Sequence, residues 1–206
     1  MRIGPLHHAG RHCKMEWLST YDAHAHTRAS RIAHEVYGEG RPFEYMTKEH
    51  CVEVYSWALP DKDTLRCLVG FMHGTRVFDP IAGSGFHAKL FAAFGIHMWC
   101  ADVQPDPDSW VPVHEHDAMA YDWGKDGASL WLSFAPGNTH DDNSEGNVVV
   151  RHCVKLRKWR WVCLAGNYRN DELAELDSIP YSQRYMRTCI QPWKESVQFR
   201  LYGRDV

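Results

Sequence analysis

The sequence has no long apolar run. A helix needs about 18 apolar residues in a row to cross a membrane, and no stretch of the 206 residues approaches that length. The first residues, MRIGPLHHAGRHCKMEW, also lack the apolar centre of a secretion signal. We therefore expect a cytoplasmic, intracellular protein with no membrane partner. The sequence leaves its oligomeric state open.

Neither sign of charge is in large excess. The chain has 23 Lys and Arg against 26 Asp and Glu, which gives a formal net charge of −3. Strong non-specific binding to nucleic acids depends on many phosphate contacts made by basic residues. The charge balance argues against a binder of that kind. A local basic patch is still compatible with this overall charge.

The cysteines have no C-x-x-C spacing, which is the usual pattern of a structural zinc site. Their number, seven, is odd, and most lie within apolar runs, so we expect buried, reduced thiols. Two histidine-rich stretches near the N-terminus are the alternative metal ligands, but no second cysteine lies close to them and we expect no metal site. They comprise His7, His8, His12 and Cys13, then His24 and His26.

The first third of the chain has the apolar spacing of helices. One helix is predicted over 16–37 and a second from Thr47. A third follows Pro60, where Asp61 can cap its first turn. The buried face of this third helix is predicted to comprise Leu65, Leu68, Val69 and Met72.

From residue 76 onward, strand and helix patterns alternate, which is typical of an α/β fold with a doubly wound, mostly parallel sheet. Two further strand patterns, 184–190 and 196–204, flank a short turn region and predict a C-terminal antiparallel pair at the edge of the sheet. The alternating strands are predicted at 76–79, 97–102, 111–114, 129–134 and 160–166, and the helices at 86–94 and 148–158.

These patterns divide the chain into two parts. Residues 1–74 are predicted to form an N-terminal helical cover, and residues 75–206 a Rossmann-like core. At this length we expect both parts to belong to one globular domain.

The first strand leads into a glycine turn, DPIAGSG, and then into a helix. Gly83 and Gly85 leave backbone N–H groups exposed and let a ligand approach where a side chain would block it. With Ala88, the spacing G-x-G-x-x-A also matches the loose dinucleotide fingerprint. The turn alone therefore does not separate NAD from other adenosine cofactors.

Three acids at successive strand ends are more informative. Asp79 precedes the glycine turn, where a carboxylate suits an amine-bearing ligand and would repel a pyrophosphate. Asp102 ends the second strand and can accept hydrogen bonds from two ribose hydroxyls. Asp117 follows the third predicted strand and is placed for an exocyclic amine such as that of adenine. The alternative for each acid is a helix cap or a residue of a surface loop.

The pattern FDPIAGSGFHAKLFAAFG…ADVQ…HDA…LWLSFAPGN resembles the class I, Rossmann-like S-adenosylmethionine-dependent methyltransferases, over roughly residues 57–166. The resemblance implies a seven-stranded sheet that ends in an antiparallel strand, S-adenosylmethionine as cofactor, and methyltransferase activity. It assigns the methionine part of the cofactor to the first acid and the turn, the ribose to the second acid, and the adenine to the third. The cofactor residues it implies are Asp79, Ala82, Gly83, Ser84, Gly85, Asp102, Val103, Asp117 and Ala118, with Trp57 and Pro60 bordering the pocket.

The end of the fourth predicted strand is the expected acceptor side. Relatives that methylate adenine carry an acid or amide there, followed by Pro-Pro and an aromatic residue, whereas this chain has Ser133, Phe134, Ala135 and Pro136. The match is partial, so the acceptor stays open between a nucleic-acid base, such as one in RNA, and a small molecule. The candidate catalytic residues are Ser133, Phe134 and Pro136.

Other residues offer further alternatives. In KLRKWRW, residues 155–161, basic residues and tryptophans can either bind nucleic acid or form a basic helix end that leads into a core strand. His114 and His116 are candidate bases or surface residues. Asn167 and Tyr168 follow the fifth predicted strand and are placed to face a substrate.

Two other functions remain open. A non-catalytic, cofactor-binding partner protein would explain the altered SFAP segment. An NAD-binding oxidoreductase would explain the glycine spacing, but it would need an apolar residue in place of Asp79, and we find no convincing Tyr-x-x-x-Lys or similar pair to supply a catalytic group.

Overall fold

The computed structural model describes residues 56, 58–133, 145–166, 181–191 and 196–204. The helices predicted over 16–37 and from Thr47 lie outside these ranges. Within them, the sequence forms seven strands and three helices in one α/β arrangement.

The strands form a single sheet with the order β3-β2-β1-β4-β5-β7-β6. The pairs from β3 through β5 are all parallel, and β7 lies antiparallel between β5 and β6. The doubly wound sheet and the C-terminal antiparallel pair are therefore confirmed. The strands are β1 (Val77–Asp79), β2 (Met98–Asp102), β3 (His114–Glu115), β4 (Ser129–Ser133), β5 (Trp161–Gly166), β6 (Tyr181–Ile190) and β7 (Ser196–Arg204).

The strand order reverses between β1 and β4. From β1 the chain adds β2 and then β3 on one side, and it returns to place β4 on the other side of β1. In open α/β sheets, ligands bind beyond the carboxyl ends of the strands at such a reversal. Asp79 ends β1 and Ser133 ends β4, so these two residues flank the reversal.

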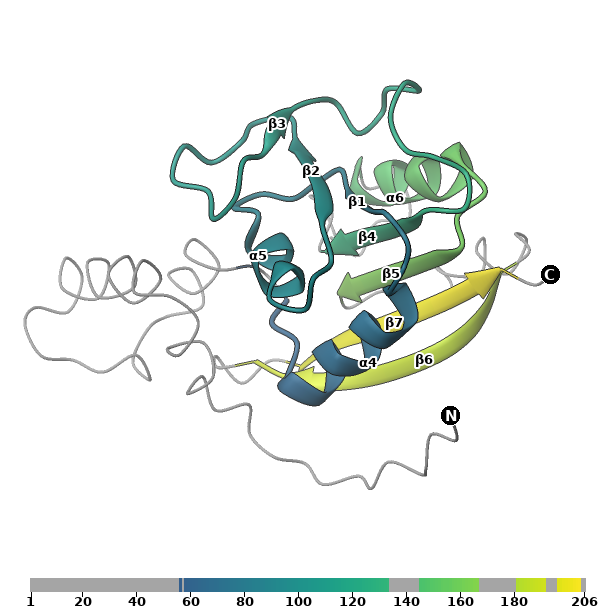
Figure 1. Ribbon diagram of the computed structural model, residues 1–206. Coiled ribbons are helices and arrows are strands. Elements are labelled where there is room, and N and C mark those ends of the chain that lie inside the picture. The colour runs from purple at the N-terminus through teal and green to yellow at the C-terminus, as the bar shows by residue number, and fades with distance from the viewer. Residues whose placement is uncertain (1–55, 57, 134–144, 167–180, 192–195, 205–206) are drawn as a thin grey trace, which may run out of the picture.

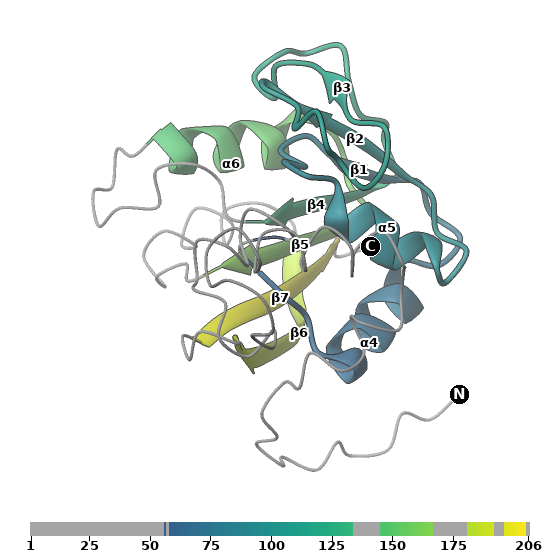
Figure 2. The same ribbon diagram turned by 90° about the vertical axis from the view of Figure 1, so that its left-hand side faces the viewer.

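Helices cover both faces of the sheet (Figures 1 and 2). On one face lie α4 (Lys62–Met72) and α5 (Phe86–Ala92), and on the other lies α6 (Glu145–Leu156). The predicted cap of α4 is confirmed, because Asp61 Oδ1 accepts a hydrogen bond from Thr64 N at 2.7 Å.

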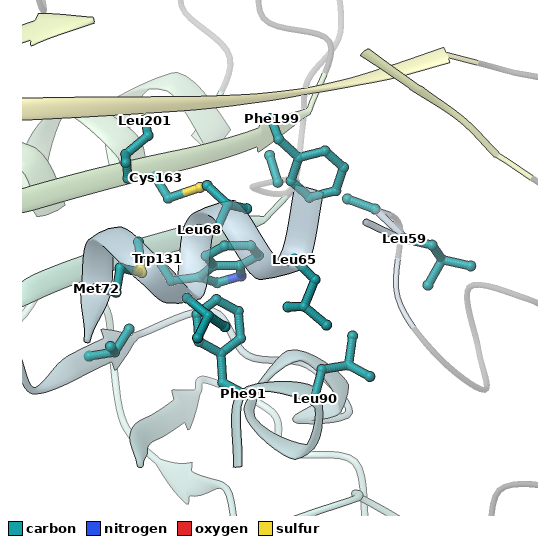
Figure 3. Close-up of a cluster of buried hydrophobic side chains, with 14 of the residues drawn as sticks. Leu59, Leu65, Leu68, Met72, Leu90, Phe91, Trp131, Cys163, Phe199 and Leu201 are labelled. Carbon is teal, nitrogen blue, oxygen red and sulfur yellow. The ribbon is translucent and has the colours of Figure 1, made fainter. Parts of the chain in front are cut away.

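The core consists of two layers separated by the sheet. Figure 3 shows the layer under α4 and α5, where Leu65, Leu68 and Met72 of α4 meet Phe91 of α5 and Trp131 of β4. The layer under α6 contains side chains from the other face of the same strands. These are Leu130, Leu132, Val162 and Leu164, packed with Val150, Cys153 and Val154. All five residues of β4 are buried, as expected for a central parallel strand.

The strand predicted at 111–114 is wrong in its position, because β3 covers only His114–Glu115. Pro112 has no N–H to donate to a neighbouring strand, and Val111 and Val113 lie against Gly85 instead. The other boundaries differ by a few residues at element ends.

Helix α4 lies within the range 1–74, yet it packs in the same core as the sheet. The helical cover over the rest of 1–74 stays a prediction, because residues 1–55 lie outside the described ranges.

Two buried polar side chains hold the segment before α4 in place. His87 of α5 forms a hydrogen bond through Nε2 with Ala58 O at 2.7 Å. Gln191 accepts a hydrogen bond from Leu59 N at 2.8 Å and donates one to Leu59 O at 3.2 Å. The residues 58–60 are thereby fastened to the first turn of α5 and to the end of β6.

Replacing Gln191 with Ala should destabilise the protein strongly. Both backbone groups of Leu59 would lose their partner while staying buried, at about 1–3 kcal/mol for each unsatisfied group. We expect the free energy of unfolding, measured by urea denaturation, to fall by about 2–4 kcal/mol. Gln183→Ala, at an exposed position on β6, is the control and should change it by less than about 0.5 kcal/mol. Equal effects of the two substitutions would contradict this role.

Candidate functional site

The turn after β1 is hydrogen-bonded to the neighbouring strand β2. Ala82 N donates a hydrogen bond to Ala101 O at 2.9 Å, and Gly85 N donates one to Ala82 O at 2.8 Å. Ser84 O accepts a hydrogen bond from Trp110 N at 2.8 Å. The turn is therefore held in one conformation at the carboxyl edge of the sheet, as the strand-turn-helix pattern predicts.

The two glycines of the turn have different roles. Both have left-handed backbone angles, with φ of +52° at Gly83 and +71° at Gly85. A Cβ at Gly85 would lie 2.8 Å from Val111 Cγ2, whereas a Cβ at Gly83 would meet no atom of the described residues within 4 Å. The interpretation that both glycines admit a ligand is thus corrected. Gly85 permits packing within the protein, and Gly83 leaves open space.

Asp102 lies directly beside this open space. Its Oδ2 accepts a hydrogen bond from Gly83 N at 2.9 Å, and its Oδ1 accepts one from Gln104 N at 3.0 Å. A dinucleotide would need the N–H groups of the turn for its pyrophosphate, but here Gly83 N–H donates to a carboxylate. A pyrophosphate at this position would be repelled by Asp102. The arrangement favours a neutral or cationic ligand with hydroxyl groups.

The third acid lies at the same edge of the sheet. His116 N donates to Asp102 O at 3.0 Å, which places the chain after β3 next to the end of β2. Asp117 is exposed, and its Oδ1 accepts a hydrogen bond from Met119 N at 2.8 Å. The next residue, Ala118, is buried, and its carbonyl accepts a hydrogen bond from Trp123 Nε1. Val103, which follows Asp102, is 72% exposed.

Asp79 occupies a very different environment from Asp102. It is 1% exposed, and its Oδ1 accepts a long hydrogen bond, 3.4 Å, from Ile81 N. Burial raises the pKa of Asp79 to about 8, against the opposing effect of the Ile81 hydrogen bond, and the nearby charge of Asp102 adds to the rise. The sequence interpretation assumed an ionised carboxylate here. In the ligand-free protein near neutral pH, this carboxyl group is mostly protonated.

Ser133 ends β4 on the other side of the strand-order reversal from Asp79. It is 8% exposed, and no residue within the described ranges hydrogen-bonds its Oγ. The other catalytic candidates, Phe134 and Pro136, lie outside those ranges, as does Trp57 of the cofactor set. Pro60 is buried in the segment that His87 and Gln191 hold against α5.

The candidate histidines and tryptophans have structural partners. His116 Nε2 lies 3.2 Å from Asp122 Oδ1, and the ring of His114 stacks on Trp99. Trp159 is fully buried and donates a hydrogen bond from Nε1 to Cys153 O at 2.8 Å, while Trp161 packs against Phe71. The core alternative for the tryptophans of KLRKWRW is therefore confirmed. Asn167 and Tyr168 lie outside the described ranges.

Sequence reasoning missed His87 and Gln191, which position the segment next to the turn. Burial lowers the pKa of His87 to about 4, although its hydrogen bond to Ala58 opposes this shift. The ring is thus neutral near pH 7. No local pattern marks either residue, because their partners, Ala58 and Leu59, are distant in sequence.

In the part of the chain that the structure describes, no helix is long and apolar enough to span a membrane. No group of three or more His, Cys, Asp or Glu side chains there is arranged to hold a metal ion.

No protein-family model matches this sequence, and no curated protein matches it either. Solved structures do match. Magnesium protoporphyrin IX methyltransferase from Synechocystis PCC 6803 with bound S-adenosylmethionine has a TM-score of 0.57 at 13% identity, over 97% of this chain and 100% of that one.

Two further structures share the arrangement. A 1,6-didemethyltoxoflavin-N1-methyltransferase from Burkholderia thailandensis has a TM-score of 0.51 at 12% identity, over 69% of this chain and 78% of that one. TehB from Haemophilus influenzae has a TM-score of 0.50 at 7% identity, over 77% of this chain and 67% of that one. The chain therefore has the fold of the class I S-adenosylmethionine-dependent methyltransferases.

The buried Asp79 should make the stability of the ligand-free protein depend on pH. Its pKa is about 8 in the folded state and about 3.9 when unfolded, so between these values only the folded state holds the proton. The free energy of unfolding should then fall as the pH rises from about 4 to 8, by up to about 1.4 kcal/mol per pH unit. Asp79→Asn should remove this contribution.

The informative pH window for this test lies above 6.5. His87 has the opposite effect, because its pKa is lowered to about 4. Its contribution to the free energy of unfolding is lost as the pH falls below about 6.5. Urea denaturation from pH 6.5 to 8 should therefore show a steeper decline for the wild-type protein than for Asp79→Asn. Parallel curves would mean that the carboxyl group titrates normally.

Proposed function

We propose that this protein is an S-adenosylmethionine-dependent methyltransferase. The observation that carries the proposal is the turn at Gly83, where open space adjoins a carboxylate that already holds the backbone N–H. A ligand with ribose hydroxyls and a positive charge suits this site better than a pyrophosphate. The class I methyltransferase fold supports the same conclusion.

The residues at this edge fit the parts of S-adenosylmethionine. Asp102 can accept hydrogen bonds from the two ribose hydroxyls, since each carboxylate oxygen has more than one lone pair. Val103 offers an exposed apolar side chain to the adenine ring, and Asp117 with Ala118 lies nearby for its amine. The open space at Gly83, together with Ala82 and Ser84, accommodates the methionine part.

Asp79 would respond to the amino group of the cofactor. Near pH 7 its carboxyl group is mostly protonated because its pKa is about 8. A cation placed near it favours the ionised form and lowers the pKa. Binding should thus release a proton from Asp79 and exchange its unfavourable burial for a charge pair.

When bound, the cofactor supplies an electrophilic methyl group on a sulfonium. The protein then has to orient an acceptor in line with that methyl group and exclude water. Ser133, with an unpaired buried hydroxyl among the described residues, and Phe134 and Pro136 beyond it are the proposed acceptor side. Because SFAP matches the adenine-methylating pattern only in part, we favour a small-molecule acceptor over a base in RNA.

Titration calorimetry of the purified chain with S-adenosylmethionine, S-adenosylhomocysteine and NAD tests the cofactor. We expect both sulfur ligands to bind and NAD to give no heat. Repeating the titration in buffers of different ionisation enthalpy should reveal the proton released from Asp79. Binding of NAD alone would support the oxidoreductase. Binding without turnover of any acceptor would support the non-catalytic alternative.

The substitution Gly83→Ala tests whether a ligand binds beside the turn, and a matched control accounts for its effect on protein stability. The new methyl group would enter the open space, so we expect at least a tenfold loss of S-adenosylhomocysteine affinity, about 1.4 kcal/mol. Gly95→Ala is a matched control, since Gly95 also has a positive φ, +75°, and open space around its Cβ position. Both variants should lose about 1–2 kcal/mol of stability, but only Gly83→Ala should lose affinity. If affinity survives in Gly83→Ala, the ligand does not approach this turn.

A further inference from the structure

A hollow of about 720 Å³ lies away from the glycine turn. Its wall comes from three places in the sequence: the loop before β4, the end of α6 with the connection to β5, and the first residue of β6 with the last of β7. The lining residues are Gly124, Lys125, Asp126, Val154, Lys155, Leu156, Arg157, Lys158, Tyr181 and Arg204.

This hollow is at the opposite edge of the sheet from the cofactor site. The loop 124–126 leads into the amino end of β4, and residues 154–158 lead into the amino end of β5. Tyr181 pairs with Arg204 at the same edge. Figure 1 shows the arrowheads of β4 and β5 on one side of the molecule and that of the antiparallel β7 on the other.

The hollow is far more basic than the chain as a whole. Five cationic residues line it against one carboxylate, Asp126, although the chain has a formal net charge of −3. A concave surface with one sign of charge and low-dielectric walls focuses the electrostatic potential. The lining is therefore suited to an anion with several charges.

Hydrogen bonds hold part of this lining in place. Arg157 donates from Nη2 to Tyr121 O at 2.7 Å and from Nη1 to Leu156 O at 2.9 Å. Asp126 Oδ1 accepts a hydrogen bond from Lys158 N at 2.9 Å, which joins the loop before β4 to the connection before β5. At Gly124, with φ of +79°, a Cβ would lie 2.6 Å from the ring of Trp159, so the loop packs directly on the core. The hollow is thus preformed.

Tyr181, the aromatic residue among those that line the hollow, exposes little of its ring for stacking. Trp159 is fully buried and Tyr181 is 7% exposed. Base–aromatic stacking is how many proteins hold single-stranded nucleic acids, so a base would gain little here. Recognition would depend on the cationic side chains and thus on phosphate groups.

From this geometry we propose that the hollow binds a ligand bearing two or more phosphate groups. The phosphates would lie between Lys125 of the loop before β4, Lys158 of the connection to β5 and Arg204 at the end of β7. Such groups occur in a free nucleoside polyphosphate and in the backbone of a nucleic acid. This proposal does not depend on the identity of the cofactor at the other edge.

Titration calorimetry of the full chain with tripolyphosphate at about 50 mM salt tests the site. The double substitution Lys125→Gln with Lys158→Gln should weaken binding about tenfold or more, and it should lower the dependence of affinity on salt. Both lysines are exposed, so the fold should be unchanged. The control, Arg66→Gln with Lys89→Gln, alters net charge equally but lies on α4 and α5, and should leave affinity within about twofold.

A second titration, with a ten-nucleotide single-stranded RNA, distinguishes a free polyphosphate ligand from a nucleic-acid backbone. Tighter binding of RNA than of tripolyphosphate, lost in the lysine variant, would identify a nucleic-acid backbone. Equal or tighter binding of tripolyphosphate, lost in the same variant, would identify a free polyphosphate. Bound ligand should also protect Lys125 and Lys158, but not Lys89, from acetylation. No binding, or equal affinity in the lysine variant and the control, would overturn the proposal.

Discussion

The parallel pairing of β1 with β4 sets the position of the candidate ligand site. Val77 pairs with Ser129 and Phe78 with Leu130, and the hydroxyls of Thr75 and Ser129 are joined at 2.6 Å just before the strands run together. A shift of one residue in this register would turn Trp131 into the layer under α6 and Leu130 and Leu132 into the layer under α4 and α5, so that neither core would pack as it does. The reversal of strand order, and the site beside it, depend on this register.

At the carboxyl edge, two aspartates in neighbouring strands have opposite surroundings. Asp102 accepts two backbone N–H groups at a partly exposed position, whereas Asp79 is buried with a single long hydrogen bond. The first arrangement suits a carboxylate that stays charged and receives hydroxyls. The second disfavours the ionised form of the carboxyl group, and a bound cation would favour that form again. One turn can therefore select a ligand that is both hydroxylated and cationic.

The two edges of the sheet differ in charge because different segments end there. At the carboxyl edge, Asp79 and Asp102 end β1 and β2 and Asp117 follows β3, while the basic end of α6 and the loops entering β4 and β5 meet at the amino edge. Cations at a helix C-terminus are favoured by the helix dipole, which explains part of this basic cluster. The two proposed ligand surfaces therefore lie at opposite edges of the sheet and carry opposite charge.

Local sequence patterns were sufficient to predict the element types, the parallel sheet, its antiparallel end and the cap at Asp61. Periodicity and capping depend on residues that are close in the chain. It also identified the glycine turn and the three acids. Only the tertiary structure decided that Gly85 serves packing against Val111, that Asp79 is buried, and that His87 and Gln191 fasten the segment before α4. The basic hollow likewise exists only because α6, the loop before β4 and the last strand meet in space. Contacts between distant segments set burial and therefore pKa, and no local pattern encodes them.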